Sequence, residues 1–138
     1  VAKGGNIDLL FVGDSITDWW RQPQRGLPVF TEYFGTLKTA NFGIAGDTTQ
    51  GVLWRMQNGE LDGFQAKLIV LMLGTNNINR NTNADIAQGN RAIIDEFRKR
   101  QWRTTIESMQ TATVNPPRSP GMIRIYGLDE GVKEVPLK

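Results

Sequence analysis

The sequence predicts an α/β protein built around a parallel sheet. Residues 7–12 and 68–73 are nearly continuous apolar runs, typical of buried strands, and residues 39–44 are a third strand candidate. Each stretch ends at a polar loop that contains glycine, and a segment with helical periodicity follows. An alternation of strand and helix over the first hundred residues is the pattern of a parallel sheet with crossover helices.

Four helices are expected between and after these strands. Residues 15–22 and 29–37 form two short helical patterns, the second with aromatic residues on one face. A third helix begins after Asp47 or Thr48, because either side chain suits the N-cap position. The last helix, around residues 86–100, carries an apolar stripe and ends in three basic residues that favour the negative end of its dipole.

The pattern changes after Gln101. Apolar residues are only loosely spaced over 102–114, and a proline-rich loop follows. Met122–Tyr126 alternates and predicts one short strand. We therefore expect an α/β core over 1–101 and an atypical or truncated tail over 102–138 with one added strand. Because so short a sheet leaves an exposed edge, we also expect a homodimer or higher oligomer.

Composition excludes several classes of function. The net charge is only +2, and the one basic cluster, Arg98–Arg100, is expected at a solvated helix end, so nucleic-acid binding is not expected. No apolar run is long enough for a membrane span. Because the chain starts at Val1 rather than at methionine, we expect that upstream residues were removed. The location therefore stays open between a cytoplasmic and a secreted bacterial protein.

Three polar loops define the candidate site. Ser15, Gly46 and Asn76 each lie just beyond the carboxyl end of a predicted strand, and right-handed crossovers bring such loops to one edge of the sheet. The Ser15 hydroxyl is a candidate nucleophile. The backbone N–H groups of Ser15 and Gly46 and the Asn76 amide are candidate donors to an oxyanion. Each residue alone suits an ordinary turn or helix cap, but their joint order favours acyl-transfer chemistry.

These loops resemble a known family. Gly13–Thr17, Gly43–Thr49 and Gly74–Asn77 are similar to the first three sequence blocks of the GDSL/SGNH hydrolases. The resemblance covers residues 4–101. Within Asn41–Leu61 and Leu73–Asn77 it is closest to the branch that holds the platelet-activating-factor acetylhydrolase catalytic subunits and their bacterial esterase relatives.

The resemblance implies a flavodoxin-like three-layer α/β/α sandwich and a small acyl-ester substrate, with no metal and no organic cofactor. By position in the motifs, Ser15 is implied as the nucleophile and Gly46 and Asn76 as oxyanion-hole partners. Asp14 and Asp47 are implied as supporting residues that hold the loops.

One block of the family is missing. Its Asp-x-x-His block supplies the acid and base of the catalytic triad, and this chain contains no histidine. A serine hydroxyl is a weak nucleophile without a base, and binding with an oxyanion hole alone retains only about 10³–10⁴-fold catalysis over water. We therefore expect weak or absent esterase activity from this chain alone.

Two other functions compete with this interpretation. The first is a non-catalytic module that binds a carboxylate or another small anion at the same loops. The second, a phosphate site at the helix start, is disfavoured because Asp14 and Asp18 repel phosphate.

Three further residues are candidates for substrate binding. Trp19 and Trp20 follow Ser15 and suit either a substrate groove or packing, because the tryptophan ring is apolar while its N–H can donate a hydrogen bond. Asn77 belongs to an asparagine-rich loop that suits either contact with a sugar or a solvated turn.

Overall fold

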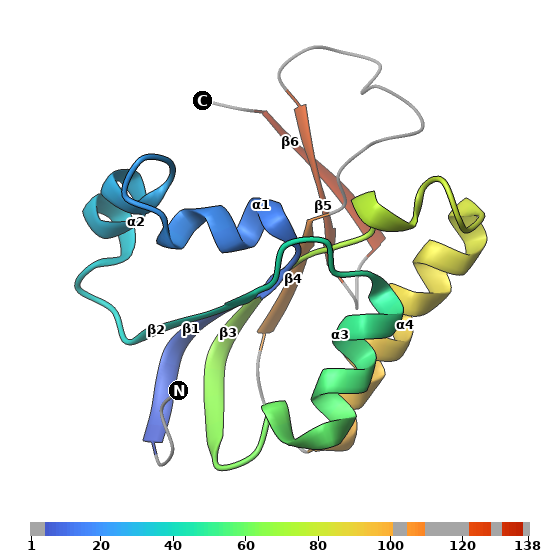
Figure 1. Ribbon diagram of the computed structural model, residues 1–138, viewed down its shortest axis with the longest axis horizontal. Helices are drawn as coiled ribbons and strands as arrows, with labels where there is room; N and C mark the ends of the chain where they lie inside the picture. Colours follow the sequence, from blue (N-terminus) through green and yellow to red (C-terminus); the bar gives the residue numbers. More distant parts are fainter. Residues whose placement is uncertain (1–4, 101–104, 110–121, 128–130, 137–138) are drawn as a thin grey trace.

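The computed structural model describes residues 5–100, 105–109, 122–127 and 131–136. Six strands form one sheet in the order β2-β1-β3-β4-β5-β6 (Figure 1). The first four in chain order pair in parallel, and the last two pair antiparallel. The strands are β1 (Gly5–Gly13), β2 (Thr39–Gly43), β3 (Phe64–Met72), β4 (Thr105–Met109), β5 (Met122–Gly127) and β6 (Gly131–Pro136).

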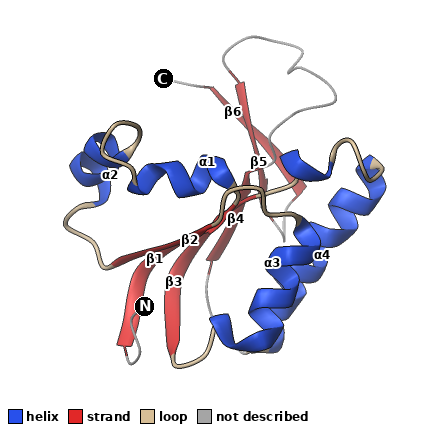
Figure 2. Cartoon of the chain, viewed as in Figure 1, coloured by secondary structure: helices blue, strands red, loops and turns tan. Residues whose placement is uncertain are grey.

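Helices cover both faces of this sheet (Figure 2). Those on one side are α1 (Ser15–Asp18), the 3-10 turn η1 (Trp19–Arg21) and α2 (Leu27–Phe34). Those on the other side are α3 (Thr49–Arg55), the turn η2 (Met56–Glu60) and α4 (Asn83–Lys99). The expected α/β fold with a parallel sheet is thereby confirmed. Among the described helices, none is both long enough and apolar enough to cross a membrane.

The main core lies between the sheet and the helices α3 and α4. Strand alternation directs Leu10 and Val12 of β1 to this side, and both are almost fully buried. Apolar residues of β3, α3 and α4 complete the cluster, among them Ile69, Leu71, Val52, Ile93 and Phe97.

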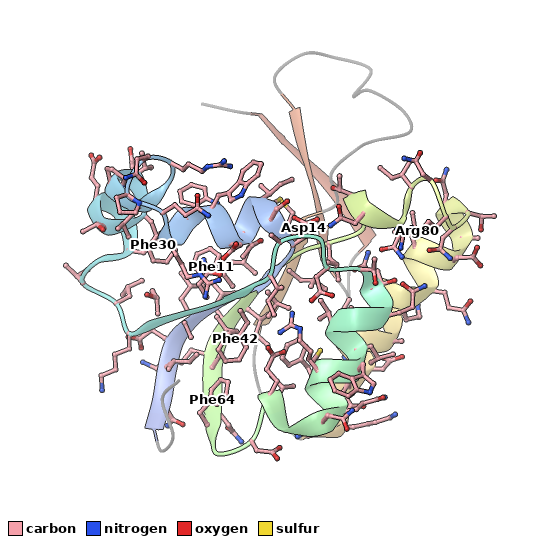
Figure 3. All side chains as sticks on the ribbon, viewed as in Figure 1. Phe11, Asp14, Phe30, Phe42, Phe64 and Arg80 are labelled. Atoms are coloured by element: carbon pink, nitrogen blue, oxygen red, sulfur yellow. The ribbon has the colours of Figure 1, made fainter. Side chains whose placement is uncertain are left out.

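The opposite face of β1 carries an aromatic cluster. Phe11 contacts Phe30 and Phe34 of α2, with ring centroids 5.2 Å and 5.3 Å apart (Figure 3). Strand β1 is therefore packed on both sides. Its carboxyl end is fixed in place just before Ser15.

Two elements differ from the sequence-based expectation. The expected helix over 15–22 is instead the four-residue α1 followed by the 3-10 turn η1, where the Arg21 guanidinium donates to the Gly43 carbonyl. Beyond residue 101 the structure has three strands where the pattern predicted one. Strand β5 matches the prediction, whereas β4 and β6 were missed because their apolar residues do not alternate along the strand. Charged residues and proline, as in β6, are typical of an edge strand.

Candidate active site

Ser15 is the first residue of α1, directly beyond the end of β1. Two glycines allow this helix to lie close to the strand ends. A Cβ at Gly13 would collide with the Thr17 hydroxyl and the Met72 carbonyl, and one at Gly43 would collide with the Asp18 backbone nitrogen. Gly13 and Gly43 are also register partners in β1 and β2. The close approach leaves the Ser15 side chain half-buried at the carboxyl edge of the sheet.

Asp14 caps the helix that Ser15 begins. Its Oδ1 accepts a hydrogen bond from the Ile16 backbone N–H at 3.0 Å, as an N-cap side chain does. The residue is only 1% exposed, and its Oδ2 has no hydrogen-bond partner among the described residues. Burial raises the pKa of Asp14, and the nearby Asp47 raises it further, while the bond from Ile16 acts in the opposite direction. Asp14, labelled in Figure 3, therefore combines an N-cap hydrogen bond with a raised pKa, and its role as a supporting residue stays a prediction.

The second loop is a turn that presents Gly46. The Asp47 backbone N–H donates to the Ile44 carbonyl at 3.1 Å, and Gly46 between them has φ of 82°. The turn is joined to the first loop because the Ile44 backbone N–H donates to the Gly13 carbonyl at 3.1 Å. Thr48 then caps α3 by accepting from the Gly51 backbone N–H. Of the two N-cap candidates in the sequence, Asp47 and Thr48, the structure therefore uses Thr48.

The third loop brings Asn76 to the second. Gly74, with φ of 130°, precedes the 3-10 turn η3 (Thr75–Asn77). From this turn the Asn76 Nδ2 donates to the Asp47 carbonyl at 2.7 Å. A primary amide has two N–H groups, so one remains for another acceptor. Hydrogen bonds therefore connect all three loops that the sequence analysis singled out.

The three candidate substrate-binding residues, Asn77, Trp19 and Trp20, all make contacts within the protein. Asn77 is 1% exposed and uses its side chain within the protein, so it is not a surface for substrate. Trp20 packs against Phe30 of α2, with ring centroids 6.1 Å apart. Trp19 is 39% exposed, and the Arg25 guanidinium lies 3.9 Å from its ring centroid. Both tryptophans lie on η1 and contact the α2 region.

Arg55 is a site residue that the sequence analysis missed. Its Nε and one terminal nitrogen bind Asp47 Oδ2 at 3.0 Å and 2.8 Å, and that terminal nitrogen also donates to the Phe42 carbonyl. A further ion pair joins Arg55 to Glu60. Both Arg55 and Asp47 side chains are largely buried. The only sequence signal was a lone arginine in the last turn of an amphipathic helix.

A groove of about 680 Å³ is lined mainly by β2, with further residues from β1, η2 and β3. Its lining includes Arg21, Ala40, Phe42, Ile44 and Phe64, and the rings of Phe42 and Phe64 meet edge to face (Figure 3). None of Ser15, Gly46 and Asn76 lines this groove. The groove therefore reaches the second loop at Ile44 but does not include these three residues.

Comparison with known proteins identifies the class. Residues 11–135 match the model of the GDSL-like Lipase/Acylhydrolase family. The chain therefore belongs to this family, and the resemblance seen in the sequence is confirmed.

The individual relatives are acetylhydrolase subunits. The chain is 45% identical over 105 residues to platelet-activating factor acetylhydrolase IB subunit alpha2 of Homo sapiens, covering 76% of this chain and 44% of the relative. It is 38% identical over 100 residues to the alpha1 subunit of Bos taurus, covering 72% and 41%. The chain thus spans less than half the length of these curated relatives.

Solved structures agree with the fold. A protein of Streptococcus pneumonia named for platelet activating factor superposes with a TM-score of 0.60 at 27% identity, covering 78% of this chain and 46% of that one. The acetylxylan esterase Axe2 of Geobacillus stearothermophilus gives a TM-score of 0.54 at 20% identity, covering 79% and 61%. At that identity the second likeness concerns the fold alone.

Proposed function

We propose that this chain carries the nucleophile and oxyanion hole of an ester hydrolase that acts on small acyl esters through an acyl-serine. The observation that carries the proposal is the hydrogen bond from Asn76 Nδ2 to the Asp47 carbonyl. It holds the asparagine amide against the turn that presents the Gly46 N–H, and that turn is bonded to the end of β1 just before Ser15. The names of the curated relatives specify acetyl ester hydrolysis, so an acetyl ester is the proposed substrate class.

The proposed reaction proceeds in two steps. The ester carbonyl oxygen accepts hydrogen bonds from the Ser15 and Gly46 backbone N–H groups and from the free N–H of Asn76. Ser15 Oγ attacks the carbonyl carbon while its proton passes to a base, and the alcohol then leaves with a proton. Water attacks the acyl-serine in the second step and releases the carboxylic acid. Donors already held in position stabilise the oxyanion, and losing one such donor lowers the rate by about 10²–10³-fold in other serine hydrolases.

The chain lacks a histidine to act as the base. A serine hydroxyl reacts slowly when nothing accepts its proton. The proposed activity of this chain alone is therefore weak. An external base is expected to increase it.

Added imidazole tests this proposal. We expect hydrolysis of an acetyl ester by the chain to be slow in plain buffer and to rise with imidazole concentration. The chain with Ser15→Ala provides the background from imidazole alone. An increase that disappears in Ser15→Ala supports the proposal. Equal rates for the two chains at every imidazole concentration contradict it and favour a module that only binds a small anion.

A further inference from the structure

Asn77 uses all of its side-chain hydrogen-bonding groups inside the protein. Its Oδ1 accepts from the Thr49 backbone N–H at 3.1 Å. Its Nδ2 lies 2.8 Å from Gln50 Oε1, 2.9 Å from Asn81 Oδ1 and 3.3 Å from the Thr49 hydroxyl. With 1% of its surface exposed, the side chain has no group left for a substrate.

Asn77 binds Thr49, which is the first residue of α3. Thr49 lies two positions after Asp47 and three after Gly46, and it is itself 1% exposed. The first backbone N–H groups of a helix have no partner within the helix, so the Asn77 oxygen satisfies a donor that would otherwise be buried without one. On its other side Thr49 contacts α4, where a Cβ at Gly89 would collide with the Thr49 hydroxyl.

Two consecutive asparagines thus hold the same short segment. Asn76 binds the Asp47 carbonyl and Asn77 binds the Thr49 N–H, so the segment is attached to η3 at both ends. Figure 1 shows the start of α3 beside η3, which follows β3. The Gly46 N–H immediately precedes this segment, and the Asn76 amide lies on the turn that holds it. The spacing of these two donors therefore depends on both bonds.

We propose that Asn77 is a positioning residue that keeps the Gly46 N–H and the Asn76 amide at the separation an oxyanion requires. This proposal rests on the proposed function, because it assumes that these two groups bind the oxyanion. Displacement of a catalytic group by about 1 Å can lower a rate by about 10²-fold. Loss of the Asn77 side chain frees the Asp47–Thr49 segment at one end and shifts Gly46 relative to Asn76.

Methylboronic acid reports on this geometry without a catalytic base. Ser15 Oγ forms a bond to boron, its proton passes to the buffer, and the boron becomes tetrahedral and anionic with a hydroxyl in the oxyanion position. Boron-11 NMR detects the tetrahedral species, and titration gives its Kd and the number of sites. A variant that is partly unfolded shows fewer sites at an unchanged Kd, whereas a displaced oxyanion hole shows a weaker Kd.

The expected result for Asn77→Ala is a Kd raised about tenfold, smaller than the loss from removing a donor outright. Asn90→Ala is the matched control. Asn90 is also a buried asparagine, but it donates to the Leu73 carbonyl and makes no hydrogen bond to the Asp47–Thr49 segment. We expect its Kd to stay within about threefold of the unaltered chain.

Asn77→Asp is the conservative variant if the alanine variant does not fold. It retains an oxygen for the Thr49 N–H, and the amides of Gln50 and Asn81 can turn their N–H groups toward the new carboxylate. We expect its Kd to lie between those of the unaltered chain and the alanine variant.

The outcomes separate this inference from the proposed function. If the unaltered chain forms an adduct and every folded Asn77 variant binds equally well, the positioning role is overturned and the proposed function stands. If the unaltered chain forms no adduct that depends on Ser15, the proposed function is contradicted, and the positioning role with it.

Discussion

Gly46 is held in a left-handed conformation at an exposed turn with open space around it. Its φ is 82°, and no atom lies within 4 Å of where a Cβ would be. The requirement for glycine therefore comes from the backbone alone. It differs from Gly13, where neighbouring atoms exclude a side chain.

Gly46→Ala is expected to reduce the free energy of unfolding by about 1 kcal/mol, because an L-residue in this region is strained by about that amount. Gly46→Asn should lose less, since asparagine tolerates the left-handed region. Urea denaturation of the three chains measures the differences. An alanine variant as stable as the unaltered chain would show that the turn does not need its positive φ.

Asp14 is a second single residue with a testable effect, because it makes the stability of the protein depend on pH. Burial raises its folded-state pKa above the ordinary value of 3.8, so the folded chain holds this proton more tightly than the unfolded chain. The protonated Asp14 carboxyl therefore stabilises the folded chain at low pH. This stabilisation is lost as the pH rises through the raised pKa.

Asp14→Asn remains neutral and retains an oxygen for the Ile16 N–H. We expect the stability of the asparagine variant relative to the unaltered chain to increase from about pH 4 to about pH 7. Urea denaturation across this range provides the measurement. Two parallel stability curves would argue against a raised pKa at Asp14.

At the scale of the element, α4 begins with a complete capping box. The Thr82 hydroxyl accepts from the Asp85 backbone N–H, and the Asp85 carboxylate accepts from the Thr82 backbone N–H at 2.9 Å. Both residues are exposed, and the hydrogen bonds of the box join them only to each other. The cap therefore stabilises the helix without contacting the candidate site.

Thr82→Ala should reduce the free energy of unfolding by about 1 kcal/mol, the usual effect of losing an N-cap. Thr31→Ala, at an exposed position inside α2, is the control and should change stability by less than about 0.5 kcal/mol. Thermal and urea unfolding measure both. If the two variants lose the same stability, the cap is not what stabilises α4.

Helices and strands that are determined by their own residues could be predicted from the sequence. Buried strands such as β3 follow from their apolar runs, and the amphipathic stripe located α4. The short α1 did not follow, because the turn η1 that replaces the rest of the expected helix ends at Arg21, whose guanidinium donates to the Gly43 carbonyl of β2. Asn77 was misassigned for a similar reason: a polar loop residue looks exposed until its partners on α3 are known. Arg55 was missed because its partners, Asp47 and the Phe42 carbonyl, lie 8 and 13 positions away.

At the scale of the molecule, side chains form hydrogen bonds with backbone groups near the end of the edge strand β2. On β2, the Gly43 carbonyl accepts from Arg21 and the Gly43 N–H donates to Asn41 Oδ1. Edges with paired backbone groups are poor templates for another strand. The other edge strand is β6.

The self-association expected from the sequence remains a prediction. Sedimentation equilibrium should show a dimer that dissociates on dilution. A monomer at every concentration up to the solubility limit would contradict it.

The fold and the meeting of the three candidate loops could be predicted together because the loops follow three parallel strands. Sequence order alone brings such loops to one edge. What it did not reveal is how they are joined, through the Ile44–Gly13 and Asn76–Asp47 hydrogen bonds. These bonds turn three neighbouring loops into one site.

Ser15 is proposed as a nucleophile facing a preformed oxyanion hole. Labelling with a fluorophosphonate tests this directly: Ser15 Oγ bonds to phosphorus, fluoride leaves and the hydroxyl proton passes to the buffer, and peptide mass spectrometry locates the label. We expect slow labelling at Ser15 that imidazole accelerates and that Asn76→Ala slows by about 10²-fold. Labelling at another residue, or labelling of Ser15 at the same rate in Asn76→Ala, would contradict it.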